Sequence, residues 1–542
     1  MIENLKIKII QDKFLNLDFI SNFKNIEKYY LEKDNIDILV LPNLSTCGCF
    51  PFDLILKTDV LEKNNQIIDR ILKLSNKLDK AVVFGTIIKE KDKLFNVIAF
   101  IFNNKIQYIY KNNFNNNSIK ESVYFNHTDN NTNIIQFKNN NILITFKEDI
   151  DDIKIKTGDI HLGIVIDSSC FEILDSQINS INTRIEKLKD LSIKLKTKVI
   201  YLNNLGILDH LIFDGSSFVV DNGLLIYKMN SFEIMEMVIY SQNIYKEIET
   251  FNTNYENIVY RSIIFYIREF MQINKFKGLI IGLSGGIDSA LSSVMAVDAI
   301  SAENVMLVSM PSLYTSSLSK KIAKNISSTL KIQLKEINID KLANLYNTEF
   351  LDAKIPTKLS LENSQARIRG NLLMNMSNEF LGFIVVNNGN KTEVAVGYST
   401  LYGDSCGAIS FIQDLYKKQV YQIAKYRNTN IIDGVTNNLL DIIPKECLER
   451  KPSAELKENQ FDEDSLIKYE ILDNILEDFL DKKLSIQELY KIYNIEDVKK
   501  VINLIFNAEY KRKQGALGIK ISYSHFKENF VIPYNHNYKS LL

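Results

Sequence analysis

Cysteine and histidine are scarce in this chain, with five of each among 542 residues. No two histidines share one face of a helix in the way that metal ligands do, which excludes a zinc hydrolase. The cysteines follow neither a disulfide framework nor the spacing of zinc ligands. They are Cys47, Cys49, Cys170, Cys406 and Cys447.

An excess of one charge and long apolar runs are also missing. Lys and Arg number 65 and Asp and Glu number 66, so the charge balance predicts neither a nucleic-acid nor a membrane partner. No apolar stretch is long enough to cross a bilayer, and residues 1–11 lack a signal-peptide pattern. We therefore expect a cytoplasmic protein. The length suits roughly two to four domains, and 46% hydrophobic residues allow a large core.

The sequence contains short β-branched runs that alternate with amphipathic patterns, which predicts an α/β fold. In the first half we expect strands at 36–41, 81–88, 96–102, 142–146, 162–166, 198–202 and 217–220, and helices at 60–78 and 178–195. The polar residues 242–256 are the best linker, which predicts domains at 1–245 and 255–542. Strands at 279–283, 305–309, 332–337 and 383–386 then predict a doubly wound parallel sheet, whose ligands bind at the carboxyl ends of the strands.

A glycine-rich turn joins the expected strand at 279–283 to a helical pattern at 290–299. Backbone N–H groups at a helix start suit a polyphosphate, two serines add hydroxyls, and Asp288 can hold Mg²⁺. The Walker-loop ending is absent. The turn instead resembles the pyrophosphate loop of enzymes that split ATP between its α and β phosphates to activate a carboxylate as an adenylate. It consists of Gly282, Leu283, Ser284, Gly285, Gly286, Ile287, Asp288 and Ser289.

Further polar motifs follow the other expected strands. Ser312 ends a Met-Pro-Ser segment suited to contacting an adenosine, and residues 362–370 place two arginines at an expected helix start. The fourth strand ends in Asn-Gly-Asn-Lys-Thr-Glu at 388–393. Other polar motifs lie at 401–404, 414–418, 451–456, 462–465 and 509–512.

In this order, over residues 255–535, the motifs resemble the NAD synthetase family, which amidates the carboxylate of deamido-NAD with ATP. The most specific part is Gly-Asn-Lys-Thr-Glu at 389–393 with Val-Gly-Tyr-Ser-Thr-Leu-Tyr-Gly-Asp at 396–404. The resemblance implies an adenine nucleotide α-hydrolase-like domain. It also implies two steps: deamido-NAD attacks the α-phosphorus of ATP, and ammonia then displaces AMP.

The resemblance assigns roles to single residues. Asp288 and Glu393 match the family's Mg²⁺ ligands, and with Lys417 they would form the catalytic group. The glycine-rich turn, Ser312 and Asn388 would bind ATP, although the family usually has a threonine where Asn388 stands. The residues at positions where the family grips deamido-NAD are Asn363, Glu393, Asp404 and Lys511.

Simpler interpretations stay open for several of these residues. Glu393 could only cap or pair on the first turn of a helix. Arg367 and Arg369 could form surface ion pairs. Lys417, which stands beside Lys418, could belong to a solvated basic face.

The first half resembles, more weakly, the nitrilase-type glutaminase domain fused to many bacterial NAD synthetases, an α-β-β-α sandwich. In that family a Glu, a Lys and a Cys hydrolyse glutamine through a thioester. Lys111 matches the lysine, but Asn43 stands at the Glu position and Lys147 at the Cys position. Residues 39–54, 141–150, 163–171 and 213–220 carry the resemblance.

These replacements predict that the glutaminase is lost. A carboxamide cannot take a proton from a nucleophile at neutral pH, and an attacking lysine would form a stable amide. Free cysteines such as Cys170 are usually small buried hydrophobes rather than substitutes. We expect a structural or assembly role for this half, free ammonia or a separate glutaminase as the nitrogen source, and a homo-oligomer by analogy with the family's dimers.

Three alternatives remain at this stage. The first is a glutamine-dependent NAD synthetase with an unusual glutaminase site. The second is another adenylating amidotransferase or tRNA-thiolating enzyme with the same loop. The third is a binding module without activity, against which the intact motifs at 284–289 and 389–404 argue.

Overall fold

The computed structural model describes residues 2–114, 119–128, 133–153, 159–175, 178–248, 254–349, 357–458 and 460–541. The chain divides into two compact units, Met1–Asn252 and Thr253–Leu542. The expected linker at 242–256 contains this division, but helix α4 already begins at Tyr255 with Asn254 as its N-cap.

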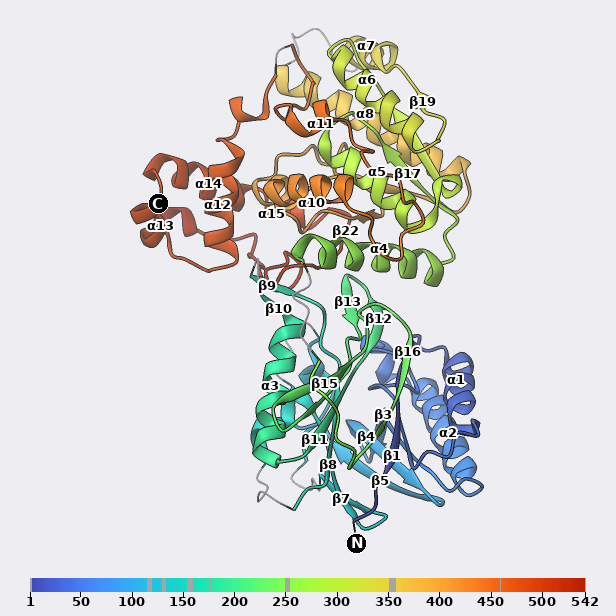
Figure 1. Ribbon diagram of the computed structural model, residues 1–542. Coiled ribbons are helices and arrows are strands. Elements are labelled where there is room, and N and C mark those ends of the chain that lie inside the picture. The colour runs from blue at the N-terminus through green and yellow to red at the C-terminus, as the bar shows by residue number, and fades with distance from the viewer. Residues whose placement is uncertain are drawn as a thin grey trace. The chain divides into compact units, whose positions relative to one another are not determined.

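Two six-stranded sheets form the centre of the first unit (Figure 1). The first sheet has the order β16 (Met235–Tyr240), β1 (Lys6–Gln11), β2 (Ile38–Val40), β3 (Ala81–Glu90), β4 (Lys93–Phe102) and β5 (Lys105–Tyr110). The second has the order β15 (Leu224–Lys228), β14 (Phe218–Asp221), β11 (Lys198–Asn203), β8 (Leu162–Asp167), β7 (Asn140–Phe146) and β6 (Ile134–Phe137). Two small ribbons pair β9 (Ile173–Asp175) with β10 (Ile178–Asn179) and β12 (Leu205–Leu208) with β13 (Leu211–Asp214).

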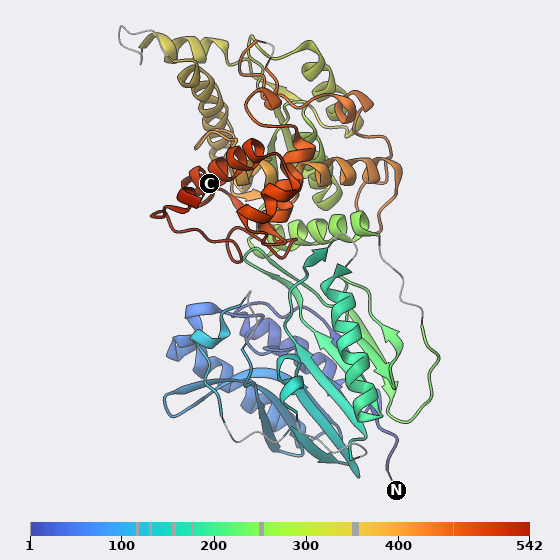
Figure 2. The same ribbon diagram turned by 90° about the vertical axis from the view of Figure 1, so that its left-hand side faces the viewer.

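The two sheets pack face to face and carry helices on their outer faces. Residues of both sheets, such as Ile9 and Val83 from one and Ile144 and Ile200 from the other, share one buried apolar cluster. Helices α1 (Phe19–Leu31) and α2 (Thr58–Ser75) cover the first sheet, and α3 (Ser180–Leu195) covers the second (Figures 1 and 2). This arrangement confirms the predicted α-β-β-α sandwich.

Helix α3 starts later than the sequence pattern predicts. The helix was expected from residue 178, but Ile178 and Asn179 pair in β10 instead. The side chain of Asn179 then accepts hydrogen bonds from the N–H groups of Ile181 and Asn182, which caps the helix. Strand pairing and the cap together decide the boundary.

The second unit is built on a six-stranded parallel sheet. Its order is β19 (Lys335–Glu336), β18 (Val305–Ser309), β17 (Gly278–Gly282), β20 (Phe383–Asn387), β21 (Ile409–Ser410) and β22 (Leu517–Gly518). All neighbours run parallel. Strand order reverses between β17 and β20, and ligands bind at such a switch point in doubly wound sheets. The predicted doubly wound sheet is confirmed, but the strand expected at 332–337 shrinks to two residues.

Helices cover both faces of this sheet. On one face, helix α8 packs Leu373 and Met376 on Ile280, Val308 and Val385. On the other face, α5 packs on β17 and β18, and α4 and α10 pack on α5. The helices are α4 (Tyr255–Ile273), α5 (Ile287–Ile300), α6 (Ser317–Thr329), α7 (Asp340–Glu349), α8 (Lys358–Glu379), α9 (Lys391–Val396), α10 (Lys417–Thr429) and α11 (Lys445–Glu449). The motif at 362–370 was expected at a helix start, but Thr357 caps α8 and the motif lies inside the helix.

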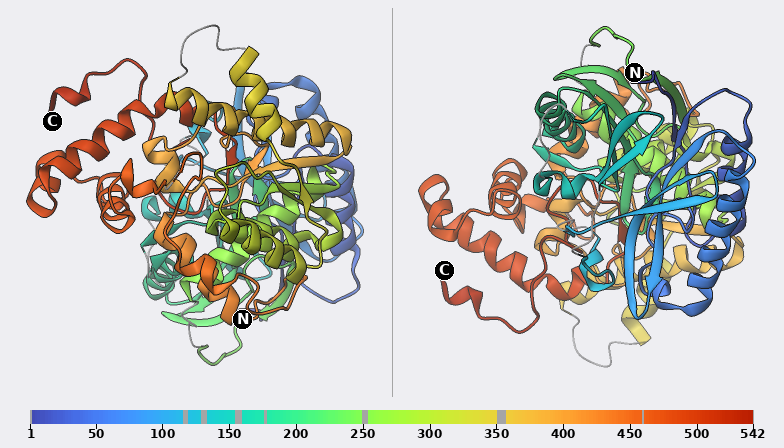
Figure 3. Two further views of the ribbon diagram at one scale, coloured as in Figure 1. Left: turned by 90° about the horizontal axis from the view of Figure 1, so that it is seen from above. Right: turned by 90° about the horizontal axis from the view of Figure 1, so that it is seen from below.

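A helical lobe completes the second unit. It contains α12 (Tyr469–Leu480), α13 (Ile486–Ile492) and α14 (Ile495–Asn507), followed by the short α15 (Glu509–Arg512). The lobe extends to one side of the sheet (Figure 3). Its apolar core includes Ala395 and Val396 of α9, so the lobe holds the short helix that follows β20. None of the described helices is long and apolar enough to cross a membrane.

Candidate active site

The glycine-rich turn after β17 has the geometry of an anion cradle at a helix start. Gly285 has a φ of +85°, and a Cβ there would lie 2.4 Å from the Ser319 carbonyl oxygen, so only glycine fits. The hydroxyls of Ser284 and Ser289 lie 3.1 Å apart. Gly286 is the N-cap of α5, and its N–H donates to Ser284 Oγ. Backbone N–H groups and the positive end of α5 therefore meet at the carboxyl end of β17.

A cavity of about 330 Å³ opens in front of this turn. Seven of the eight turn residues, Asp288 among them, line this cavity, and only Gly285 does not. The loop after β18 contributes Met310 and Pro311. The predicted residues that line the cavity are Gly282, Leu283, Ser284, Gly286, Ile287, Asp288, Ser289, Asn388, Glu393, Asp404, Lys417 and Lys511.

One buried ammonium joins the two predicted metal carboxylates. Lys417 Nζ lies 2.6 Å from Asp288 Oδ2 and 3.1 Å from Glu393 Oε1. In the sequence, Asp288 stands 105 residues before Glu393, and Glu393 stands 24 residues before Lys417. Only 3% of the Lys417 side chain is exposed, so the solvated basic face was the wrong interpretation for this residue. Glu393 lies in the first turn of α9, but its carboxylate also contacts Lys417 and lines the cavity.

The charges of this group are strongly coupled. Burial raises the pKa of Glu393 to about 7, opposed by Lys417 and reinforced by repulsion from Asp288. Burial alone would lower the pKa of Lys417, but the two carboxylates raise it above its usual value. Two carboxylates forced together at a phosphate turn suit a divalent cation completed by phosphate oxygens. Among the described residues no larger cluster of His, Cys, Asp or Glu could hold a metal.

Three predicted binding residues take different positions around the cavity. Asn388 lines it and donates from Nδ2 to the Gly282 carbonyl oxygen at 3.1 Å, while its Oδ1 is buried without a hydrogen-bond partner among the described groups. Ser312 is buried behind the lining. Asn363 also lies outside the lining and accepts a hydrogen bond from Thr400 Oγ1 at 2.7 Å.

Asp404 and Lys511 reach the cavity from the loop after α9 and from α15. Asp404 Oδ1 accepts the N–H of Thr400 at 2.6 Å, which ties the loop into a turn. Lys511 Nζ donates to the carbonyl oxygens of Gly397 and Ser399 at 2.7 and 2.6 Å. The structure therefore brings an acidic and a basic group to the same wall of the cavity.

Arg369, for which the sequence leaves two interpretations open, is partly buried in the cavity wall. Its Nε donates to the Met310 carbonyl oxygen at 3.0 Å. Burial lowers its pKa to about 10 because Asp404 and Glu455 compensate only in part. Arg367, by contrast, is exposed and donates to the Leu401 carbonyl oxygen.

Other lining residues have no sequence signal beyond the motifs that contain them. Asp462 accepts hydrogen bonds from the hydroxyls of Tyr398 and Tyr469 at 3.1 and 3.0 Å. Glu455 accepts hydrogen bonds from Ser316 Oγ and Ser319 Oγ at 2.7 and 2.8 Å. These contacts fasten Glu455 to the start of α6 and Asp462 to α12, and only the folded chain reveals them.

The three glutaminase positions of the first unit lie around one point at the strand ends. Asn43 Nδ2 donates to Ser168 Oγ at 2.8 Å, and Lys147 donates to the neighbouring Ser169 hydroxyl. Lys147 Nζ also lies 3.4 Å from Asp167 Oδ2. Lys111 Nζ lies 3.2 Å from Glu148 Oε2, next in sequence to Lys147.

Lys111 is enclosed by carboxylates that the sequence interpretation did not single out. Its Nζ lies 2.6 Å from Glu121 Oε2 as well as near Glu148, and all three side chains are at most 8% exposed. Burial opposes its charge, but the two glutamates raise the pKa of Lys111 above its usual value. The two glutamates therefore favour the charged form of Lys111. No motif in the sequence indicates Glu121, because its contact with Lys111 spans ten residues and forms only in the folded chain.

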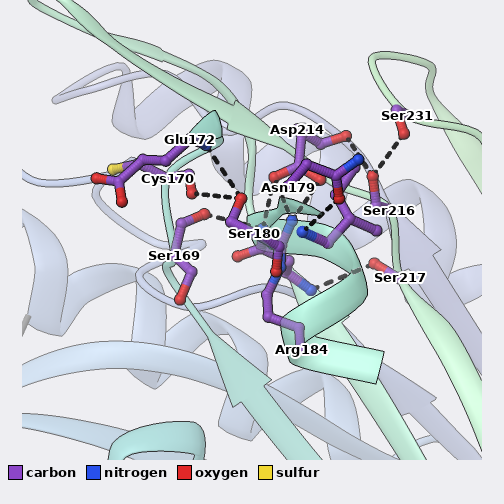
Figure 4. Close-up of polar contacts among 12 residues, drawn as sticks. Ser169, Cys170, Glu172, Asn179, Ser180, Arg184, Asp214, Ser216, Ser217 and Ser231 are labelled. Atoms are coloured by element: carbon purple, nitrogen blue, oxygen red, sulfur yellow. Dashed lines mark hydrogen bonds and ion pairs between the residues drawn. The ribbon is translucent and has the colours of Figure 1, made fainter. Parts of the chain in front are cut away.

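The cysteines of this unit are placed as buried hydrophobes. Cys47, Cys49 and Cys170 belong to one apolar cluster, and burial raises the pKa of Cys47 and of Cys49 to about 12. Figure 4 shows Cys170 contacting Ser180 through its carbonyl oxygen, with the sulfur pointing away from the Arg184–Asp214 pair. A thiol with so high a pKa carries almost no thiolate at neutral pH.

Comparisons with known proteins decide the family. The sequence profile of the NAD synthase family matches residues 259–515. The glutamine-dependent NAD(+) synthetase of Acinetobacter baylyi is 34% identical over 510 residues, which cover 91% of this chain and 90% of that protein. This chain belongs to the glutamine-dependent NAD(+) synthetase family. It is an NAD synthetase, a ligase that forms a carbon–nitrogen bond.

Further relatives agree over the full length of this NAD synthetase. The glutamine-dependent NAD(+) synthetase of Aquifex aeolicus is 32% identical over 98% of this chain and 99% of its own. The solved glutamine-dependent NAD+ synthetase of Acinetobacter baumannii, in complex with ADP, has a TM-score of 0.72 at 29% identity, with 98% of each chain covered. The Cytophaga hutchinsonii enzyme has the same fold, with a TM-score of 0.82 at 17% identity and 98% coverage of each. These relatives are named for their dependence on glutamine, whereas the sequence analysis predicts ammonia as the nitrogen source of this chain.

Proposed function

We propose that this NAD synthetase uses ATP to activate the carboxylate of deamido-NAD as an adenylate, releases pyrophosphate, and forms NAD when ammonia displaces AMP. The observation that carries the proposal is the convergence of Asp288, Glu393 and Lys417 beside a phosphate turn at the switch point of the sheet. The relative solved with ADP supports a nucleotide in this cavity.

The residues of the turn and Lys417 supply the charge that the first step needs. Backbone N–H groups at the start of α5 would hold the β and γ phosphates. Lys417 would neutralise charge on the phosphates as the bond between the α and β phosphates breaks. Asp288 and Glu393 would hold Mg²⁺, which would offset the charge of the leaving pyrophosphate. These are the residues that the resemblance assigned to catalysis and ATP binding.

The opposite wall would hold deamido-NAD. Asp404 and Lys511 line the cavity there, and Arg369 adds a cation that no carboxylate contacts among the described ion pairs. Asn363 does not line the cavity, but it is linked to Asp404 through Thr400. The Thr400 hydroxyl donates to Asn363, and the Thr400 N–H donates to Asp404. The two substrates would then meet above the turn, and this proximity removes much of the entropic cost of the reaction.

Ammonia is the nitrogen source that the first unit favours. At the position where a glutaminase needs a nucleophilic thiol stands the ammonium of Lys147, paired with Asp167. At the position of the proton acceptor stands Asn43, whose amide donates to Ser168. A separate glutaminase could supply the ammonia in the cell.

Glutamine is the second candidate donor, and the names of the relatives favour it. The deciding experiment measures NAD formed from deamido-NAD and ATP with ammonium or with glutamine, after free ammonia has been removed from the glutamine. Ammonium alone should support turnover. Glutamine-driven NAD formation at a comparable rate would refute ammonia dependence and leave the synthetase assignment intact.

A gain-of-function pair sharpens this experiment. The double variant N43E/K147C restores a carboxylate and a thiol beside the native Lys111, so it should release glutamate from glutamine, while K147C alone should not, for want of a proton acceptor. Glutamate release by wild type would contradict the proposal. The predicted homo-oligomer is tested separately by light scattering of the purified chain.

A further inference from the structure

Asn390 stands between the two carboxylates of the synthetase site and contacts both of their helices. It is the N-cap of α9, and its Oδ1 accepts the N–H of Glu393 at 3.0 Å. Its Nδ2 donates to Asp288 Oδ1 at 2.9 Å, across 102 residues of sequence. The side chain is fully buried, although it does not line the cavity.

The hydrogen bonds of Asp288 divide its two oxygens between two partners. Oδ1 receives the amide of Asn390, and Oδ2 receives the ammonium of Lys417, which also contacts Glu393. The bond from Asn390 ties the Asp288 carboxylate to the start of α9 and so restricts how this carboxylate can turn. The same carboxamide fixes the first turn of α9, from which Glu393 projects.

We propose that Asn390 is a positioning residue, whose carboxamide holds the carboxylates of Asp288 and Glu393 in one fixed arrangement so that both act on the same cation. The proposal rests on the role assigned to these carboxylates in the proposed function. Among the residues that commonly cap helices, only Asn offers an acceptor and a separate amide donor on one rigid group. Serine caps a helix but is too short to span both contacts, and Asp would set a third carboxylate against Asp288.

The test separates this role from simple helix capping. In the full-length chain, N390S keeps a good cap and loses the bond to Asp288. We expect the Mg²⁺ concentration needed for ATP binding, followed by calorimetry, to rise about tenfold, as loss of a hydrogen bond to a charged group implies. The kcat should fall by a similar factor, with an unchanged KM for ammonium.

The matched control is N494S, the same substitution at the exposed N-cap of α14, where Asn494 accepts only the N–H groups of Glu496 and Asp497. It should match wild type in every measurement. If N390S lowers the Tm, the variant N390D decides, because Asp caps a helix as well as Asn does but repels Asp288. A loss of at least tenfold in the kcat of N390D supports the positioning role. Full activity of N390D overturns it.

Two results would overturn the role of Asn390 and leave the proposed function intact. Either N390S binds ATP with the wild-type requirement for Mg²⁺, or N390D retains full activity. A wild-type chain that binds no ATP in the presence of Mg²⁺ would instead overturn the proposed function, and the role of Asn390 with it.

Discussion

Lys417 shows how the chemistry of one side chain depends on its surroundings. Two adjacent lysines are typical of a solvated basic surface. Lys417 is nevertheless buried between Asp288 and Glu393, whereas Lys418 is one-third exposed. Lys418 contacts Glu477 and Asn474 of α12 instead. The start of α10 turns successive residues in different directions, so adjacent lysines acquire different roles.

The lysine pair yields a prediction at this scale. K417M should lower the rate of pyrophosphate release about 10² to 10³-fold, because a preorganised charge at the phosphates is lost. K418M is the matched control and should stay within about twofold of wild type, since surface ion pairs contribute little. A K417M variant with more than a tenth of the wild-type rate would show that Lys417 does not act on the phosphates.

Helix α9 is the element that carries the site, and it is too short to be stable alone. It has six residues, and isolated helices of that length do not form in water. The tertiary structure holds it: Thr392 Oγ1 donates to Asp473 Oδ1 at 2.5 Å, and buried Lys391 lies 3.1 Å from Asp414 Oδ1. Gly397 ends it with a φ of +68°, where a Cβ would approach Ala508 to 2.6 Å.

Asp473 gives a pH prediction for this element. Burial raises its pKa to about 6, above the value of about 3.9 in an unfolded chain. Between about pH 4 and pH 6 the folded state therefore binds more protons than the unfolded state, and stability falls as the pH rises through this window, by about 3 kcal/mol at most. D473N lacks this titration, so its Tm relative to wild type should rise from pH 4 to pH 6 and then stay level.

Scanning calorimetry across this pH range measures the effect. E470Q, on an exposed position of the same helix, controls for loss of an acidic group. Parallel Tm profiles of D473N and wild type would show that Asp473 is not protonated in the folded state at pH 5.

At the scale of the whole molecule, the chain is two units with separate cores. The first is closed by the apolar cluster between its sheets, and the second by the clusters under α8 and in the helical lobe. The described residues that line the cavity in front of the glycine-rich turn all belong to the second unit. The glutaminase positions all belong to the first.

This division predicts that residues 254–542, expressed alone, form NAD from deamido-NAD, ATP and ammonium with a kcat within about tenfold of the full chain, because the second unit buries its own core. Circular dichroism and a single cooperative melt establish that the fragment is folded. A folded but inactive fragment would show that the first unit contributes to the synthetase step.

The pattern of the sequence was enough for the local features of this protein. Apolar runs predict half of the described strands within three residues of their observed bounds, and the spacing of glycines and hydroxyls from Gly282 to Ser289 predicts a turn between β17 and α5. The other half were not predicted: β1, β5 and β16 are six residues long and were missed, while β21 and β22 have two residues each and no period to detect. The chemical replacements at Asn43 and Lys147 are also visible in the sequence, since they depend on residue type alone.

Only the tertiary structure decided which groups meet. Asp288, Glu393 and Lys417 share contacts, Asn390 reaches Asp288, and Arg369 lies in the cavity wall rather than in a surface ion pair. Local patterns are set by backbone geometry over a few residues, and the sequence contains them directly. Contacts across a hundred residues depend on how sheet, helices and lobe pack together, and that packing is a property of the whole fold.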